Sequence, residues 1–331
     1  MQVVHGKLVL ALFLLGTCCS RIEANQTWPV YMAKDQISGA ISVSGSPADR
    51  AMINAFQQAF QNHQPSVHFS NWLHGPESAI AGVYTDVADM AIMAREVREP
   101  MERMAFQWVK LERPFELIFA NGGFNPQRPS SQLAVFVHQD NPLESISLPE
   151  LDALFSAERK RGLSAIEKWG DVGLNDKWGK QTIHLLGPMI SSIEMLFFRH
   201  KVMLNSMKWN SNYREFEHAG GALDALKNDP HGLAIAPFGL EHQGLKPLSL
   251  SADQDGLFVE LNENTVLDGS YPLRRTVSIV IHHAPGQALK PELQEFLRFI
   301  YSMQGQQVLA KNADYLPLGF VDLQTQLKRI P

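Results

Sequence analysis

The segment from Tyr271 to Leu318 constrains the fold of this 331-residue chain more than any other stretch. Its apolar run, Val277 to Ile281, is rich in β-branched residues and is followed by a Pro-Gly turn, which predicts a buried strand. Pro291 suits the first turn of a helix, where its missing N–H costs no hydrogen bond. Apolar residues at helical spacing then predict one buried face, made by Leu293, Phe296, Leu297, Ile300 and Tyr301. The segment therefore predicts a strand, a turn and a helix that close an α/β domain.

Strands and helices also alternate in the first part of the chain. Apolar runs predict strands at 37–43, 67–69 and 87–93, with helices in the two intervals between them. This order predicts a βαβαβ unit with a parallel sheet. The turn from Ser44 to Asp49 joins the first strand to a helix and presents backbone N–H groups that can bind an anion. An ordinary connecting loop is the alternative interpretation of that turn.

Composition limits the class of protein. Apolar residues make up 45% of the chain, which is enough for one large domain or two of medium size. The formal net charge is -5 at pH 7, whereas a general nucleic-acid-binding protein needs a basic surface. We therefore expect no nucleic-acid partner.

The first residues are typical of a secretory signal peptide. A weakly basic start precedes the apolar run Leu8 to Leu15 and a group of small residues, so we expect residues 1–24 to be removed on export to the periplasm. Cys18 and Cys19 are the only cysteines, so the mature chain is expected to contain no disulfide. Lipid anchoring at Cys18 or Cys19 is an alternative, since Leu15 to Cys18 loosely resembles a lipobox.

Motifs for catalysis are missing from the sequence. It contains no G-x-S-x-G, no phosphate-loop lysine motif and no H-E-x-x-H, and the mature chain has no cysteine nucleophile. His63, His68 and His74 are loosely spaced, and His282 and His283 are adjacent, so neither group has zinc-site spacing. We therefore predict a protein that is not an enzyme and that carries no metal or cofactor. An envelope hydrolase remains a third hypothesis without a nucleophile motif.

Two blocks of the sequence resemble a known family. The first block, Tyr271 to Leu318, contains YPLRR, the apolar strand, EFLRF and YLPL, and the second, Leu133 to Phe155, reads LAVFVHQDNPLESISLPELDALF. Together with Ala88 to Glu96, they resemble the phosphate-binding-protein-like periplasmic solute-binding proteins of bacterial ABC importers, which have the type II periplasmic binding protein fold. The blocks occur in the family's order and at its separation.

The resemblance implies an α/β fold of two lobes joined by a hinge. Each lobe is expected to be a mixed, mostly parallel sheet flanked by helices. The implied division assigns residues 25–122 and 250–331 to lobe one and residues 123–249 to lobe two, with the segment 124–131 beside the hinge. A ligand is expected in the cleft between the lobes.

The resemblance also implies a ligand and its partners. A small anion, phosphate or another oxyanion, is expected to be bound without metal and passed to an ABC permease by a monomeric receptor. The residues that match the family's binding turns are Ser44, Gly45, Ser46, Ser78, Arg95, Ser191 and Ser192.

The matched turns also depart from the family's pattern. Gly187 stands at an arginine position, Ile193 at a threonine position, and Pro47, Pro76 and Ala94 at positions that usually carry polar side chains. Each lost donor to a buried charged ligand costs about 1.5–3 kcal/mol. The alternative is therefore a degenerate family member that acts as an envelope interaction or signalling protein and binds no phosphate.

Overall fold

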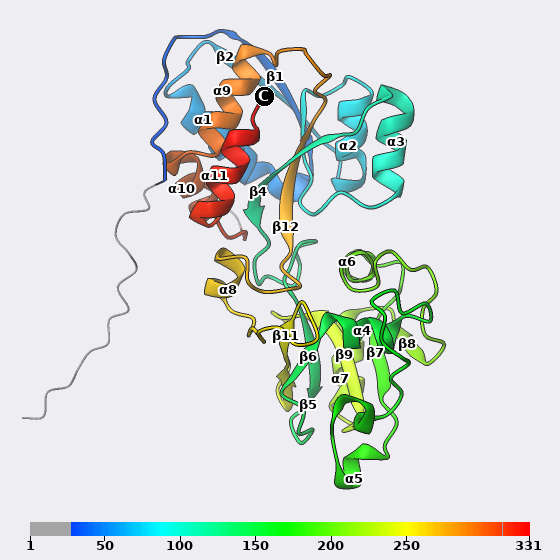
Figure 1. Cartoon of the computed structure of the whole chain (residues 1–331). Coiled ribbons are helices and arrows are strands. Elements are labelled where there is room, and N and C mark those ends of the chain that lie inside the picture. Colours follow the sequence, from blue (N-terminus) through cyan, green and yellow to red (C-terminus); the bar gives the residue numbers. More distant parts are fainter. Residues whose placement is uncertain (1–27, 313) are drawn as a thin grey trace, which may run out of the picture.

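The structure, a computed structural model, describes residues 28–312 and 314–331. These residues form two lobes that are joined by two extended segments (Figure 1). The predicted signal peptide, 1–24, and the two cysteines lie outside the described residues. Among the helices that the structure describes, none combines the length and the apolar character needed to cross a membrane.

The first lobe is built on a five-stranded mixed sheet with the strand order β2-β1-β3-β12-β4. The strands are β1 (Gly39–Gly45), β2 (Val67–Leu73), β3 (Met90–Ile92), β4 (Phe115–Asn121) and β12 (Thr276–Ile281). Strand β1 pairs in parallel with β2 and β3, which confirms the predicted βαβαβ unit. Strand β12 is antiparallel to β3 and β4, because β4 leads the chain out of this lobe and β12 brings it back.

Helices cover both faces of this sheet and create two separate cores. The helices are α1 (Arg50–Gln61), α2 (Pro76–Tyr84), α3 (Met101–Lys110), α9 (Pro291–Ile300), α10 (Met303–Asn312) and α11 (Phe320–Arg329). Helices α2 and α3 lie on one side of the sheet and the other four on the opposite side (Figure 1). Pro291 begins α9 and the five predicted apolar residues are buried, which confirms the strand-turn-helix prediction.

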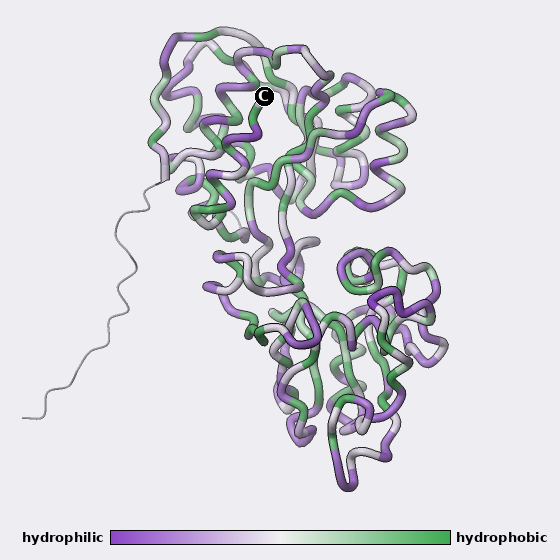
Figure 2. The backbone as a smooth tube through the Cα atoms, in the orientation of Figure 1, coloured by the Kyte–Doolittle hydropathy of each residue, from purple (hydrophilic) through white to green (hydrophobic). Residues whose placement is uncertain are grey.

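The second lobe contains another five-stranded mixed sheet, with the order β10-β5-β9-β7-β8. Its strands are β5 (Leu133–His138), β7 (His184–Pro188), β8 (Tyr213–Phe216), β9 (Gly232–Pro237) and β10 (Leu245–Pro247). Its helices are α4 (Leu148–Phe155), α5 (Asp176–Gly179), α6 (Ile193–Lys201), α7 (Ala219–Leu226) and α8 (Glu263–Leu267). Strands β6 (Ser145–Ser147) and β11 (Ser249–Ser251) form a small parallel pair beside this sheet. The central strands of both lobes are hydrophobic along their length (Figure 2).

The predicted α/β class with two lobes and mixed sheets is confirmed. The antiparallel share is larger than expected, because each sheet has two parallel and two antiparallel pairings. The extra antiparallel pairings involve the strands next to the crossings between the lobes, namely β4, β12 and β5.

Gln132 joins the two segments that cross between the lobes. Its side chain is fully buried. The Nε2 atom donates to the carbonyl oxygens of Gly122 at 2.7 Å and Arg275 at 3.2 Å, and Oε1 accepts from the backbone N–H of Arg275 at 2.8 Å. Gly122 lets the segments approach, because a Cβ there would collide with the carbonyl oxygen of Ser130. One amide side chain therefore links the two crossings, in addition to the backbone bond from the N–H of Gly122 to the carbonyl oxygen of Arg275 at 3.0 Å.

The second crossing occurs later than the predicted boundary at residue 250. Leu250, Val266, Tyr271 and Leu273 are buried in the core of the second lobe. The hydroxyl of Tyr271 also donates to the carbonyl oxygen of Leu133 in β5, at 2.9 Å. We therefore place residues 250–273 with the second lobe and the return crossing at Arg274–Arg275.

We predict that Gln132→Leu lowers the free energy of unfolding by about 3 kcal/mol, because it leaves buried backbone groups without partners. The matched control is Gln127→Leu at an exposed position of the same crossing, which should change stability by less than about 0.5 kcal/mol. Urea unfolding of both variants measures the difference. Equal stability of the two variants would contradict a bridging role for Gln132.

Candidate functional site

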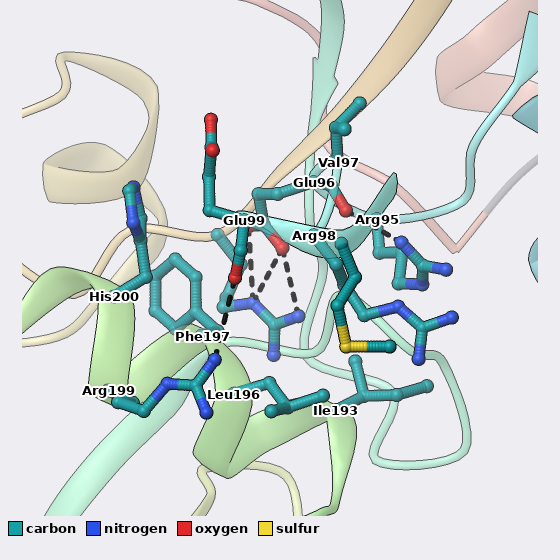
Figure 3. A pocket seen from close by; sticks show the side chains of 12 residues that line it. Arg95, Glu96, Val97, Arg98, Glu99, Ile193, Leu196, Phe197, Arg199 and His200 are labelled. Atoms are coloured by element: carbon teal, nitrogen blue, oxygen red, sulfur yellow. Dashed lines mark hydrogen bonds and ion pairs between the residues drawn. The ribbon is translucent and has the colours of Figure 1, made fainter. Parts of the chain in front are cut away.

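A cavity of about 60 Å³ lies between the lobes. One wall is the loop 95–101, which follows β3, and the other is helix α6, whose Ile193, Leu196 and Phe197 lie below that loop in Figure 3. The remaining lining residues are Arg199 and His200 of α6 and Arg275 of the return crossing. Because both lobes and a crossing segment form its walls, relative motion of the lobes would change the cavity's size.

Arg95 is the predicted ligand residue that lines this cavity. It follows Ala94, whose φ of 53° lies in the left-handed region and turns the chain after β3. The Arg95 side chain is only 1% exposed, and Nη2 and Nη1 donate to Oε1 and Oε2 of Glu102 at 2.6 and 3.0 Å. Such a bidentate pair is strong. An incoming anion must therefore compete with Glu102 for these two nitrogens.

Glu102 and Glu77 together neutralise Arg95 and Arg98. Glu102 also accepts from the backbone N–H of Arg98 at 2.8 Å, and Glu77 pairs with both arginines. Burial raises the pKa of Glu102, but the hydrogen bonds and charge of Arg95, assisted by Arg98, outweigh burial and lower that pKa below its usual value. The four side chains form a network with no net charge.

Arg275 contacts parts of both lobes. It is fully buried, and Nη2 donates to Glu96 Oε2 at 3.0 Å and to the carbonyl oxygen of Pro129 at 2.8 Å. Its guanidinium carbon lies 4.4 Å from the centre of the Phe197 ring, a cation–π contact with α6. Nη1 has no hydrogen-bond partner among the residues that the structure describes. Arg275 therefore keeps one buried charged nitrogen without a partner beside the cavity.

A second arginine ties α6 to the opposite wall. Arg199 Nη2 donates to the carbonyl oxygen of Glu99 at 3.4 Å, the contact drawn as a dashed line in Figure 3. Its Nε is buried and has no partner within 28–312 and 314–331. The cavity lining thus carries four arginines and two glutamates, an excess of two positive charges before Glu77 and Glu102 are included.

In the first predicted turn, which contains Ser44, Gly45 and Ser46, the serine side chains are bonded to backbone groups of the first lobe. The Ser44 hydroxyl is buried and donates to the carbonyl oxygen of Ala79 at 2.7 Å. Ser46 accepts from the N–H of Ala48 at 3.2 Å and caps a short 3₁₀ turn. The carbonyl oxygen of Gly45 accepts from the N–H of Gly75 at 3.0 Å, which brings the first two predicted turns together.

The other predicted serines do not line the cavity either. Ser78 is exposed and donates to the carbonyl oxygen of Gly75 at 3.1 Å. Ser192 caps α6 by accepting from the N–H of Met195 at 3.2 Å, and Ser191 is exposed. Their contribution as ligand donors stays a prediction, because Ser44, Gly45, Ser46, Ser78, Ser191 and Ser192 are all absent from the cavity lining.

The structure shows which side chains surround two of the residues that depart from the family's pattern. Gly187 lies on β7, where a Cβ would collide with the hydroxyl of Tyr213. That hydroxyl donates to the carbonyl oxygen of Pro188 at 2.5 Å. Ile193 begins α6 and lines the cavity. An aromatic ring thus stands next to the expected arginine position, and an apolar side chain stands at the expected hydroxyl position.

Sequence reasoning missed several residues of this site. Glu96, Arg199 and Arg275 were not assigned a role, although Arg275 stands in the quoted YPLRR motif. The signal that could have found Arg275 is its position before a mostly apolar strand, where a charged residue needs a partner when buried. No comparable signal marks Arg199, whose partner lies 100 residues away.

We predict that Glu102→Gln lowers stability by about 3 kcal/mol at neutral pH, because it breaks a buried ion pair. Since the folded-state pKa of Glu102 is lowered, the stability it contributes is present above its unfolded pKa, about 4.3, and is lost as pH falls through the folded value. Urea unfolding from pH 7 to 3 should therefore show a shallower loss for Glu102→Gln than for wild type. The exposed control Glu217→Gln should follow wild type, and parallel curves for all three proteins would refute the assignment.

Among the described residues, no group of three or more His, Cys, Asp and Glu side chains could hold a metal ion. The groups that can contact a ligand at this site are mainly arginine, carboxylate and apolar side chains.

Comparisons with known proteins agree with this architecture. The phosphate-binding protein PstS of Pseudomonas aeruginosa is 26% identical over 305 residues, which covers 92% of this chain and 91% of the relative. PstS from Borrelia burgdorferi has a similar structure, with a TM-score of 0.58, 15% identity and coverage of 85% of this chain and 99% of that one. An ABC-type phosphate transport receptor from Vibrio cholerae gives a TM-score of 0.53 at 17% identity, covering 83% and 99%.

A match to a family model shows which family the chain belongs to. The model described as the PBP superfamily domain matches residues 32–304, which is most of the chain and includes segments of both lobes. This match confirms the resemblance found in the sequence. The chain belongs to the PBP superfamily.

Proposed function

We propose that this chain is a solute-binding protein that holds a small oxyanion, phosphate or a related one, between its lobes and delivers it to an ABC permease. The similarity to phosphate-binding PstS along 92% of the chain supports the ligand class. The observation that carries the proposal is the buried Arg275, whose Nη1 lacks a partner in the described part of the chain while the residue lines the interlobe cavity. A buried guanidinium nitrogen without a partner is costly, and a bound anion would satisfy it.

The lining of the cavity carries an excess of positive charge, which Glu77 and Glu102 balance from outside the lining. Four arginines line it against two glutamates. Glu77 and Glu102 neutralise the pair Arg95 and Arg98. Within the described residues, Arg275 Nη1, Arg199 Nε and Arg95 Nε are buried without a hydrogen-bond partner. We therefore assign first contact with the ligand to Arg275 and a supporting contact to Arg199.

The two crossings provide a hinge for ligand capture. Hinge closure around a ligand is a common motion of two-lobed binding proteins. We expect the exported chain to work in the periplasm as a monomer, since the receptor must dock on a permease after it has closed.

A second candidate function is an envelope interaction protein that binds no phosphate. Helix α3 favours it, because Met101, Met104 and Trp108 are 70%, 39% and 74% exposed, and Leu111 at its end is 88% exposed. Exposed apolar groups at helical spacing are typical of a docking surface. The engagement of Arg95 by Glu102 also agrees with a receptor that has lost phosphate.

Calorimetric titration of the purified full-length chain with inorganic phosphate, beside a sulfate control at equal ionic strength, tests the proposal. Micromolar or tighter binding of phosphate would show that backbone amides and the arginines suffice to hold an inorganic oxyanion. Absence of heat with phosphate and sulfate at millimolar concentration would favour the interaction protein over an inorganic-oxyanion receptor.

An arginine variant tests the site directly. Arg275→Lys keeps the charge but loses the planar fork, so we expect it to weaken anion binding about tenfold. Arg274→Lys is the matched control, because Arg274 pairs with Asp322 at 2.5 Å and does not line the cavity. Equal affinities of the two variants would place the anion elsewhere.

A further inference from the structure

Resting on the proposed solute-binding function, we propose that the ligand of this cavity is a short-chain monocarboxylate, whose carboxylate binds Arg275 and whose apolar body contacts α6. The cavity combines the unpartnered Nη1 of Arg275 with a mainly apolar lining. That combination suits an anion that is charged at one end and apolar at the other.

At the charged end of the site, most nitrogens of Arg275 already donate to protein groups. Of the three guanidinium nitrogens of Arg275, Nε and Nη2 both donate to Glu96, and Nη2 also donates to Pro129. Nη1 is the nitrogen left without a partner in the described ranges. A carboxylate bears a single charge on two oxygens and can use one such donor from one direction.

The apolar part of the site comes from both lobes. Ile193, Leu196 and Phe197 contribute from α6, and Val97 and Met101 contribute from the opposite loop and the start of α3. Phe197 is held in place because Arg275 covers its ring face at 4.4 Å. When the carboxylate of the ligand is bound at Nη1, its alkyl chain would displace water from these side chains, which favours binding.

Inorganic phosphate fits this lining less well. It carries charge on all sides, and every oxygen that faces an apolar wall without a donor costs binding energy. Arg95, which the family resemblance offers as a further donor, has both terminal nitrogens bonded to Glu102. Ile193 replaces the hydroxyl that the resemblance would place here.

The size of the cavity sets the length of the ligand. A volume of 60 Å³ equals about two waters at their liquid volume of about 30 Å³ each, so the cavity admits only a small ligand. We therefore expect affinity to rise about fourfold for each methylene from acetate to butyrate and to stop rising by hexanoate.

Calorimetric titration of the purified full-length chain with acetate, propionate, butyrate, hexanoate, inorganic phosphate and sulfate tests this assignment. The expected result is the chain-length trend for carboxylates and weaker or no binding of phosphate. Binding of phosphate without carboxylate would overturn the carboxylate assignment and leave the solute-binding function standing. No binding of any of these anions would overturn both.

A pair of methionine variants on α3 provides the control. Met101 lines the cavity and is 70% exposed, so Met101→Gln should fold and should weaken butyrate binding about fivefold with little effect on acetate. Met104→Gln, one turn later and outside the cavity lining, should bind both as wild type does. Equal effects of Met101→Gln on both carboxylates, or none on either, would contradict the proposed position of the alkyl chain.

Discussion

The ion pair between Arg275 and Glu96 holds together parts of the molecule that are otherwise joined by two extended segments. Glu96 belongs to the first lobe, and its carboxylate also accepts from the backbone N–H of Thr276 at 2.8 Å, where β12 begins. Arg275 further bonds the first crossing at Pro129 and covers Phe197 of the second lobe. A buried guanidinium must keep such partners, because an unpaired buried charge costs several kcal/mol. The spacing between the lobes therefore depends on this pair.

The pairing of the remaining charges near the cavity determines which groups can still bind an anion. Glu102 and Glu77 use their carboxylates on Arg95 and Arg98, and the lowered pKa of Glu102 means that this arrangement persists at neutral pH. The cavity thus behaves as a nearly neutral and largely apolar site, although four arginines line it. Counting charged residues in the sequence would overstate its affinity for a multiply charged anion.

Much of the fold could be predicted from the sequence because the signals are local. The apolar run before Pro285 and the helical spacing after Pro291 depend on neighbouring residues, and both elements were predicted correctly. The return to the first lobe was placed too early because the segment 250–273 contains only short elements, and its burial depends on contacts such as Tyr271 with Leu133, 138 residues apart. Prediction of the site is limited for the same reason, because its contacts join residues that are far apart in the sequence. Serine capping is visible locally, whereas the pairing of Arg275 with Glu96 spans 179 residues.

The departures from the family's pattern form one coherent change in this structure. Tyr213 crowds the position of Gly187, so an arginine there would require the ring to move, and the ring is also stacked on Trp209. Ile193 brings an apolar group into the same cavity wall that Leu196 and Phe197 already make apolar. Loss of a polar donor alone would leave its former partners unsatisfied, but here apolar and aromatic neighbours accompany the loss. The α6 wall of the cavity is therefore apolar, which suits a ligand with an apolar body better than one that is charged on all sides.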